Sequence, residues 1–328
     1  MTRDISVIIP AYRATATIGR ALASVAAQTA KPREVIVVDD GSGDGTLAAA
    51  EAMGERMNGI SLIVVGQDNR GAGAARNRAL AEATSTYVAF LDADDEWLPE
   101  KIERSMAVIE GGGHVLIAHD YIRLNADGTE QTIDCARRFN QAGDPFAGLF
   151  RQGFIGTSTV MARRAAVLAA GGFDESLATA QDFDLWLKLL AAPEATFTLF
   201  PEALTRYHVT GGSISSFTAR RLACSLIIAR RHAPGLPDLW YRLFAIHYEA
   251  LTAYRSHGQY LEALTSGLKL PWDLLAATFA PRRPAAASTV LPRWVTVILW
   301  AWVVGGFGAY LYRFQDLVMA AIKLVAPL

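Results

Sequence analysis

The sequence predicts an α/β protein with a mostly parallel, Rossmann-like central sheet, and three observations lead to this class. Short continuous apolar runs at residues 5–9 and 34–38 are typical of strands buried on both faces of a sheet. Between them, apolar residues recur at helical spacing, and the connecting segments are short. Because strands that alternate with helices pair in parallel through right-handed crossovers, their carboxyl ends should meet along one edge.

The predicted elements follow one another in a regular order. The apolar runs place strands at residues 5–9, 34–38, 61–65 and 87–91, and Pro10 should end the first strand. The helical patterns place helices at residues 15–28, 47–57 and 73–83. Further along, a helix is expected at residues 100–109, with strands within 114–124, at 199–200 and at 203–207.

Composition and charge narrow the class of protein. The two cysteines, Cys135 and Cys224, are too few for a disulfide framework and fit a reducing compartment. The chain opens directly into a predicted strand, so no signal peptide is expected. Residues 1–215 carry 19 basic against 27 acidic side chains, whereas residues 216–328 carry 12 against 5. This asymmetry suggests a cytosolic domain held at an anionic membrane face, and we expect no nucleic-acid partner.

Acidic side chains stand directly after two of the predicted strands. Asp39 and Asp40 follow the second strand, and Asp92, Asp94 and Asp95 follow the fourth within four positions. Aspartates are also common in solvated turns and at helix N-termini, so this pattern alone fits either a loop or a site. Carboxylates gathered at the edge of a sheet suit a metal ion or the polar groups of a nucleotide.

A glycine-rich stretch at residues 69–77 lies between these two groups of acids in the sequence. It carries Arg70 and Arg76 and opens a predicted helix. Backbone N–H groups at a helix N-terminus, together with guanidinium groups, are well suited to bind a diphosphate. The stretch therefore favours a nucleotide-diphosphate site over an ordinary turn.

Four motifs resemble, in order and spacing, those of family 2 glycosyltransferases of the GT-A fold. They are Val7–Tyr12, Val37–Ser42, Ala75–Asn77 and Asp92–Asp94, and the resemblance covers about residues 4–215. The resemblance implies an inverting enzyme that uses a nucleotide-diphosphate sugar, with a family-level preference for a UDP-sugar. It also implies a divalent metal, Mg²⁺ or Mn²⁺.

The same resemblance implies roles for individual residues. Asp40 would bind the base, Asp92 the ribose side of the donor, and Asp94 the metal on the diphosphate. The other donor-binding positions would be Pro10, Ala11, Tyr12 and Arg76. Residues 154–160 resemble the family's strand that leads to the acceptor site.

The catalytic base that the resemblance implies is Asp182. It follows the run Gly171–Glu175, and the preceding residue is Gln181 where the family has a glutamate. An aspartate in the first helical turn also stabilises a helix through its dipole, which is the alternative role for Asp182. Asp184 is a second candidate, two positions on and therefore on another face of the helix.

His208 is a candidate lid residue or phosphate contact. It follows the predicted strand at residues 203–207 and precedes a small-residue stretch at 211–216, which suits a lid that closes over a donor. A surface histidine without a function is the alternative.

The composition changes near residue 217, and we expect three parts. Residues 1–217 form the catalytic domain, residues 218–288 a helical extension, and residues 289–328 a hydrophobic membrane-associated segment. Trp294–Tyr312 contains 19 residues without a charge, within the ~17–25 that cross a bilayer core. A buried helical hairpin or a dimer interface is the alternative. The catalytic domain is therefore expected at the cytoplasmic face of the cell membrane.

The expected function is transfer of a sugar from the nucleotide donor to a hydroxyl of a lipid-linked or polysaccharide acceptor. A sugar-phosphate nucleotidyltransferase has a similar sheet, but a glycine-rich loop with Arg and Lys should then follow the first strand. Pro10–Arg13 stands there instead. A non-catalytic, membrane-bound sugar-nucleotide binding protein would be expected to lack the metal-binding or base acid, and both are present.

Overall fold

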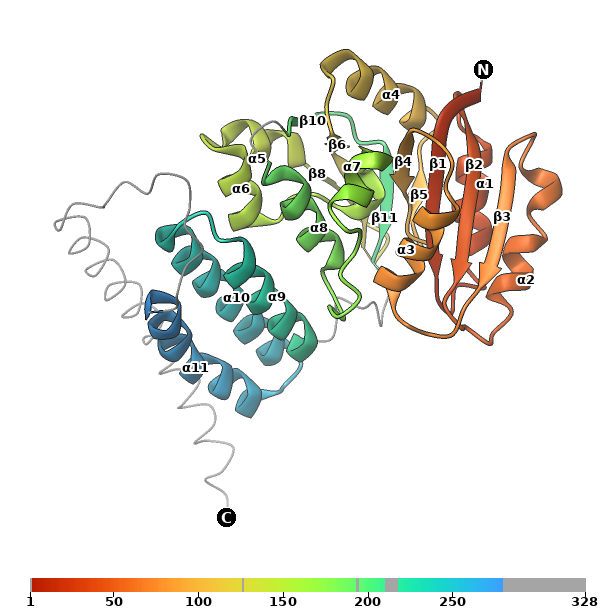
Figure 1. Cartoon of the computed structure of the whole chain (residues 1–328). Coiled ribbons are helices and arrows are strands. Elements are labelled where there is room, and N and C mark those ends of the chain that lie inside the picture. Colours follow the sequence, from red (N-terminus) through yellow and green to blue (C-terminus); the bar gives the residue numbers. More distant parts are fainter. Residues whose placement is uncertain (1, 126, 193–194, 210–217, 280–328) are drawn as a thin grey trace. The chain divides into compact units, whose positions relative to one another are not determined.

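The computed structural model describes residues 2–125, 127–192, 195–209 and 218–279 (Figure 1). The chain divides into two compact units, Met1–Ser216 and Phe217–Leu328, which we call the N-terminal and C-terminal units. In their described parts, the N-terminal unit contains the predicted sheet and the C-terminal unit consists of helices.

A seven-stranded sheet organises the described part of the N-terminal unit. In spatial order its strands are β10 (Phe197–Phe200), β6 (Leu116–His119), β9 (Met161–Arg163), β4 (Tyr87–Phe90), β1 (Thr2–Ala11), β2 (Lys31–Asp39) and β3 (Ser61–Gly66). Strand β9 runs antiparallel to its neighbours β4 and β6, and the other neighbouring strands pair in parallel. The prediction of a mostly parallel central sheet is confirmed.

Helices pack on the two faces of this sheet. They are α1 (Ile18–Ala26), α2 (Thr46–Glu51), α3 (Ala72–Glu82), α4 (Lys101–Gly112), α5 (Cys135–Gln141), α6 (Pro145–Gln152), α7 (Arg164–Ala169) and α8 (Gln181–Leu190). The alternation of side chains along β1 explains the two layers. Ile5, Val7 and Ile9 share one apolar cluster with α1, whereas Ile8 points to the opposite face and is equally buried.

A second, four-stranded sheet lies among the segments that follow the acidic residues Asp92–Asp95. Its strands, in order, are β5 (Glu96–Trp97), β11 (Thr205–His208), β7 (Tyr121–Leu124) and β8 (Glu130–Ile133). Strand β11 pairs antiparallel with β5 and parallel with β7. The chain directly after the acids is therefore held against a strand more than 100 residues later.

Three expected elements differ in the structure. Strand β1 continues through Pro10 to Ala11, because Pro10 stands near the strand's end. The helix expected at residues 47–57 is α2 followed by a 3₁₀ turn at Gly54–Arg56, where a glycine weakens the helix. Residues 154–160 do not form a strand: they contain a 3₁₀ turn, Thr157–Thr159, and β9 begins only at Met161.

The described part of the C-terminal unit consists of α9 (Thr218–His232), α10 (Leu236–Ser256) and α11 (Tyr260–Phe279). They are the helices that the sequence led us to expect in residues 218–288, they pack against one another, and α11 contains Pro271 in its interior. No helix within the described residues is both long and apolar enough to cross a membrane. The expected membrane segment Trp294–Tyr312 lies outside the described residues.

A buried lysine lies below the second sheet. Lys101, the first residue of α4, is fully buried, and its Nζ sits 4.1 Å from the centre of the Trp97 ring. This amine makes no hydrogen bond with the described residues. Burial lowers the pKa of Lys101 from 10.5 to about 7. Contact with the ring offsets only part of the cost of burying a charge.

We expect Lys101→Met to stabilise the protein. Below pH 7 both the folded and the unfolded chain carry the proton, so the folded chain bears the full cost of burying it. Above pH 7 the folded chain releases the proton, and the wild type gains stability up to about pH 10.5. Chemical denaturation should show the variant more stable by about 2–4 kcal/mol at pH 6.5, with a gain that shrinks toward pH 10.

Lys31→Met, at a partly exposed position, is the matched control and should show no such gain. A Lys101→Met protein less stable than the wild type at pH 6.5 would contradict the expectation, and so would a gain that does not change with pH.

Candidate functional site

Four of the predicted site residues, Tyr12, Asp40, Asp92 and Asp94, follow the carboxyl ends of the three neighbouring strands β4, β1 and β2 (Figure 1). The backbone N–H of Asp40 donates to the carbonyl of Ala11 at 2.8 Å, and that of Leu91 donates to the carbonyl of Ile8 at 3.0 Å. These bonds continue the parallel ladders up to the edge of the sheet. The segments beginning at Tyr12, Asp40 and Asp92 therefore emerge side by side, as the sequence predicted.

Asp40 holds the loop that leads into α3. Its buried carboxylate accepts hydrogen bonds from the Gln67 side chain at 2.8 Å, from the Arg70 backbone at 2.9 Å and from the Gly71 backbone at 2.8 Å. The next residue, Gly41, has φ +70°, and a Cβ there would lie 2.9 Å from the Asn69 nitrogen. Only glycine allows the two loops to approach so closely. Contact of Asp40 with a nucleotide base stays a prediction.

Tyr12 presents an aromatic ring beside this loop. Pro10 and Ala11 are the last residues of β1, and Tyr12 follows with 48% of its surface exposed. The Arg13 guanidinium lies 5.2 Å from the ring centre, and the Arg13 N–H donates to the Ser42 hydroxyl at 2.8 Å. These contacts hold the turn that leaves the ring accessible to a stacking partner.

Arg76 and Asp92, which the sequence placed in the donor site separately, form an ion pair with each other. The guanidinium of Arg76 donates to the Asp92 carboxylate at 2.7 Å. Arg76 is almost completely buried, and it lies 5.3 Å from the centre of the Phe173 ring. The pair ties the first turns of α3 to the end of β4.

Ser158 fixes the acidic segment from the other side. Its hydroxyl accepts a hydrogen bond from the Asp92 N–H at 3.1 Å and donates one to the buried Asp95 carboxylate at 2.5 Å. Its carbonyl accepts hydrogen bonds from the Trp97 indole at 2.7 Å and from the Thr205 hydroxyl at 3.1 Å. We call this arrangement the Ser158 clamp. It holds the Asp92 backbone and the Asp95 carboxylate in place.

The carboxylates create a strongly negative field at this edge. Burial, followed by the charges of Asp92 and Asp94, raises the pKa of Asp95 well above its usual range. Burial and the same three carboxylates raise the pKa of Tyr207 to about 12. A cation placed here would relieve this repulsion.

A divalent metal at Asp94 fits this chemistry. Among the described residues no group of three or more His, Cys, Asp or Glu side chains is placed to hold an ion. A metal at Asp94 would therefore take further oxygen ligands from the diphosphate of a donor and from water, which is how Mg²⁺ commonly binds. The Arg20 guanidinium donates to the Asp94 carbonyl at 2.5 Å and holds the backbone at this point.

Asp182 lies in the first turn of α8, partly exposed. Its carboxylate accepts hydrogen bonds from its neighbour's backbone, Phe183 N–H, at 2.8 Å and from the Thr157 hydroxyl. The other candidate, Asp184, is fully buried and forms an ion pair with Lys188 at 2.7 Å. A buried, paired carboxylate is poorly placed to meet an incoming substrate, so the geometry favours Asp182.

The 3₁₀ turn at Thr157–Thr159 joins the two parts of the site. Thr157 contacts Asp182, and the next residue, Ser158, contacts Asp92 and Asp95. The first turn of α3 also approaches α8, since a Cβ added at Gly73 would lie 3.3 Å from the side chain of Gln181. Sequence reasoning missed this turn by expecting a strand. The available signal was three consecutive hydroxyl residues inside an otherwise apolar stretch.

His208 supports the acidic segment through its backbone. Its N–H donates to the Asp95 carboxylate at 3.2 Å, and its ring Nε2 lies 3.6 Å from a Glu96 carboxylate oxygen. Burial and the nearby Arg20 charge lower the pKa of His208, although Glu96 opposes the change. The stretch at residues 211–216, expected to form a lid, lies outside the described residues.

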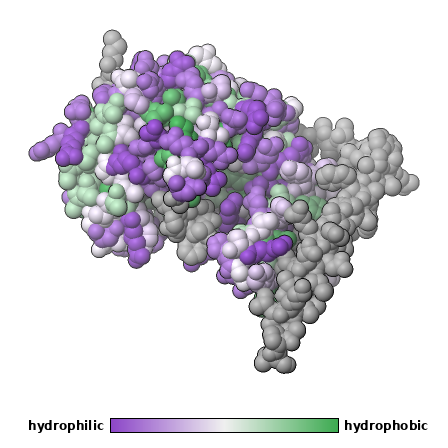
Figure 2. Space-filling view, turned by 180° about the vertical axis from the view of Figure 1, so that it is seen from behind, coloured by the Kyte–Doolittle hydropathy of each residue, from purple (hydrophilic) through white to green (hydrophobic). Residues whose placement is uncertain are grey.

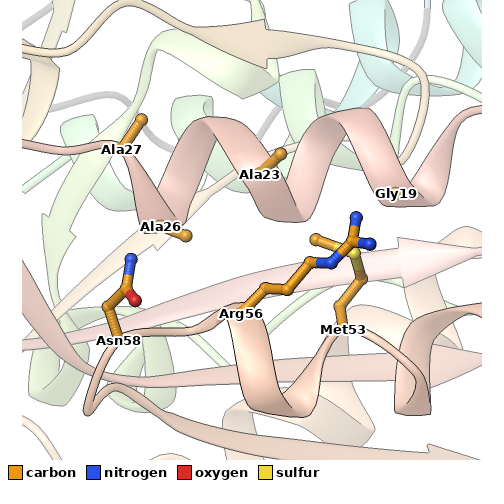
Figure 3. A pocket seen from close by; sticks show the side chains of 7 residues that line it. All are labelled: Gly19, Ala23, Ala26, Ala27, Met53, Arg56 and Asn58. Carbon is orange, nitrogen blue, oxygen red and sulfur yellow. The ribbon is translucent and has the colours of Figure 1, made fainter.

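A pocket elsewhere in the N-terminal unit does not suit a nucleotide sugar. It has a volume of about 350 Å³ and lies between α1 and the segment after α2 (Figure 3). Its lining residues are Gly19, Ala23, Ala26, Ala27, Met53, Arg56 and Asn58. Arg56 is the only charged side chain in this lining, and no carboxylate belongs to it. We therefore place the candidate site at the strand ends.

Comparisons with known proteins identify the family of the chain. The family model described as Glycosyl transferase family 2 matches residues 6–168. The amylovoran biosynthesis glycosyltransferase AmsB of Erwinia amylovora is 33% identical over 211 residues, which are 62% of this chain and 69% of AmsB. TuaG of Bacillus subtilis (strain 168), named for teichuronic acid biosynthesis, is 34% identical over 220 residues, which are 65% of this chain and 81% of TuaG.

Solved structures share the fold at lower sequence identity. S. aureus TarS 1–349 in complex with UDP has a TM-score of 0.60 at 22% identity, covering 84% of this chain and 81% of that one. The mannosyltransferase PcManGT from Pyrobaculum calidifontis, in complex with GDP-Man and Mn²⁺, has a TM-score of 0.59 at 19% identity, covering 99% and 88%. These structures confirm the predicted GT-A fold. The chain belongs to glycosyltransferase family 2, and it is a glycosyltransferase.

Proposed function

We propose that the protein transfers a sugar from a nucleotide-diphosphate donor, a UDP-sugar by preference, to a hydroxyl of a lipid-linked or polysaccharide acceptor. The observation that carries this proposal is the 3₁₀ turn at Thr157–Thr159, because two adjacent residues of the turn contact the two parts of the site. Ser158 contacts Asp92 and Asp95 at the acidic end of β4, and Thr157 contacts Asp182. A donor held at the acidic strand end would therefore lie close to an acceptor activated by Asp182. Relatives named for amylovoran and teichuronic acid biosynthesis support a saccharide acceptor.

The donor would lie across the ends of β1, β2 and β4. The exposed ring of Tyr12 and the loop held by Asp40 are placed to receive the base. Asp92 would accept hydrogen bonds from ribose hydroxyls, and its ion pair with Arg76 fixes its orientation. TarS in complex with UDP and PcManGT in complex with GDP-Man, which share the fold, support binding of a nucleotide.

Asp94 would hold the divalent metal. When bound, such a metal neutralises the charge that grows on the departing diphosphate. Burial is the main cause of the raised pKa of Asp95, and the charges of Asp92 and Asp94 add to it. A cation at Asp94 would relieve this added repulsion, which supports the role. PcManGT is described with Mn²⁺, which supports Mn²⁺ or Mg²⁺ as the ion.

Asp182 would accept the proton of the acceptor hydroxyl as that hydroxyl attacks the anomeric carbon. The Thr157 hydroxyl and the Phe183 N–H donate to the carboxylate and orient it. Attack from the face opposite the diphosphate needs no covalent sugar–enzyme intermediate. The reaction we propose is therefore an inverting transfer.

We place this reaction at the cytoplasmic face of the cell membrane. The uncharged run Trp294–Tyr312 and the basic excess of residues 216–328 support this location. A lipid-linked acceptor would then be available at the same surface.

A panel of nucleotide sugars tests the proposed function. The purified full-length protein is incubated with UDP- and GDP-sugars and with Mn²⁺ or Mg²⁺, and released nucleotide is measured. We expect release from one sugar nucleotide above all others, and only with the metal present. Equal, metal-independent release from every donor would contradict the proposal.

We expect Asp94→Asn to abolish metal-dependent donor binding and to leave the fold intact. The substitution removes the charge that would hold the metal, and the backbone hydrogen bond of Asp94 to Arg20 remains. Calorimetric titration with the preferred donor, with and without Mn²⁺, measures the effect. Glu51→Gln, an exposed acid on α2, is the control. The role of Asp94 is wrong if Mn²⁺ strengthens donor binding equally in the variant and the wild type.

We expect Asp182→Asn to lower the rate of transfer by about 10²–10⁴-fold, the usual contribution of a general base, with donor affinity nearly unchanged. Asp184→Asn should instead lower thermal stability, because it leaves Lys188 without its buried partner. Measuring kcat and donor affinity for both variants separates the two roles. If only Asp184→Asn lost turnover at full stability, the base would be Asp184.

We expect Ser158→Ala to weaken metal-dependent donor binding and to lower stability by about 1–3 kcal/mol. The substitution removes the hydroxyl that donates to the buried Asp95 carboxylate and accepts from the Asp92 N–H, so both groups lose a hydrogen-bond partner. Thr159→Val is the matched control, since among the described residues the Thr159 hydroxyl donates only to the carbonyl of Gly156, just before the turn. Thermal unfolding and donor titration with Mn²⁺ measure both effects. Equal losses of donor affinity in the two variants would contradict a specific role for the Ser158 clamp.

A further inference from the structure

Helix α11 has apolar side chains on two opposite faces. One face contains Ala263, Leu270, Leu274 and Ala277, which are buried in the C-terminal unit. The other contains Leu261, Leu268, Trp272 and Leu275 at the same spacing, which places them on successive turns of the opposite side. These four are 69%, 56%, 72% and 51% exposed, so none of the described residues covers them. We call them the outer face of α11.

Exposed apolar side chains are concentrated in this unit. In the N-terminal unit the large exposed ones are Tyr12, Tyr207 and Val209, which adjoin the candidate site, and Leu168. Figure 2 shows that the N-terminal unit, seen from behind, presents mostly hydrophilic residues with small hydrophobic areas between them. A helix that is apolar on both sides is normally covered on both sides. The outer face therefore requires a partner.

The sequence beyond α11 indicates what this partner is. Only residues 280–293 separate the helix from the uncharged run Trp294–Tyr312, and 14 residues span at most about 50 Å. If that run enters a bilayer, α11 is tethered within reach of its surface. A bilayer interface also suits the composition of the outer face, because tryptophan prefers the interface and leucine the acyl region below it.

The net charge of the C-terminal unit favours an anionic membrane. Residues 216–328 carry 12 basic and 5 acidic side chains. One of the acids, Asp273 on α11, is neutralised by Arg230 of α9 and lies 3.0 Å from His247 of α10. Lys269 adjoins the outer face and is exposed, so its amine reaches headgroups while its stem follows the apolar surface. On α11 itself the exposed Glu262 and Lys269 balance each other. The attraction to anionic headgroups therefore comes from the basic excess of the whole unit, which includes Arg282, Arg283 and Arg293 in the sequence just beyond the helix.

We propose that the outer face of α11 lies on a lipid bilayer containing anionic lipids and forms a second membrane contact, in addition to Trp294–Tyr312. The contact holds the C-terminal unit flat against the surface. It rests on the membrane location given in the proposed function, and it does not depend on the identity of donor or acceptor.

A fluorophore at position 272 tests the proposal. Trp272→Cys in the full-length chain is labelled with an environment-sensitive NBD group, and the wild type, whose two cysteines are buried, gives the background labelling. Emission and iodide quenching are measured without vesicles, with phosphatidylcholine vesicles, and with vesicles of phosphatidylcholine and phosphatidylglycerol at 3:1. Leu168→Cys, exposed on α7, is the control position.

We expect a blue shift and a several-fold loss of quenching at position 272 with the anionic vesicles, a smaller change with phosphatidylcholine alone, and no change at position 168. A label that is already protected without vesicles, at every protein concentration, would mean that another segment of this chain covers the face. Protection that rises with protein concentration would mean a second copy covers it. Either result overturns the proposal.

A charge substitution provides the second measurement. The double variant Leu268→Glu/Trp272→Glu should bind the anionic vesicles at least about ten-fold more weakly, because it removes two large apolar groups from the contact. Its hydrolysis of the preferred donor in solution should equal that of the wild type. If the labelled chain binds vesicles but iodide still quenches the label at position 272, the α11 contact is wrong and the membrane location stands. If the full-length chain does not bind vesicles at all, the membrane location is wrong as well. If the wild type does not hydrolyse the donor, only the proposed chemistry is contradicted.

Discussion

The burial of Asp95 beside Asp92 and Asp94 is the constraint on which the rest of the site depends. A buried carboxylate next to two others is costly unless its oxygens are satisfied, and this requirement draws two distant segments to the end of β4. Ser158 supplies a hydroxyl to one oxygen, and the His208 backbone supplies an N–H to the other. The 3₁₀ turn and strand β11 of the second sheet each supply one of these contacts.

The same contacts orient the groups that we assign to chemistry. The Ser158 hydroxyl also accepts a hydrogen bond from the Asp92 N–H, and the hydroxyl of its neighbour Thr157 donates to the Asp182 carboxylate. Below these residues an aromatic cluster of Phe90, Phe173 and Trp186 supports the site, with ring centres 5.5–6.2 Å apart. A site held by hydrogen bonds above and by packed rings below has little freedom to drift, and this rigidity favours pre-organised binding.

The sequence predicted the central sheet well, because a strand buried on both faces leaves an unmistakable apolar run, as in β1, β2 and β4. It also located the acidic strand ends, since carboxylates directly after such runs are rare in a core. It missed β5 and β8, which are too short or too polar to leave a pattern. It could not foresee the Ser158 clamp, because a serine 63 residues from Asp95 carries no signal of its partner. The pairing of Arg76 with Asp92 was missed for the same reason.

The insertion of β9 between β4 and β6 has a consequence for synthesis on the ribosome. Strands β3, β2, β1 and β4 are complete once residue 90 has emerged, yet the open edge of β4 is paired only when residues 161–163 arrive. The Asp95 carboxylate gains the Ser158 hydroxyl just before β9 is made, and it gains the His208 N–H only after β9. A nascent chain therefore carries the unpaired edge of β4 from residue 90 until residue 161, and Asp95 lacks its last hydrogen-bond partner until residue 208. An open strand edge can pair with other chains, so this interval exposes the growing chain to aggregation and to chaperone contact.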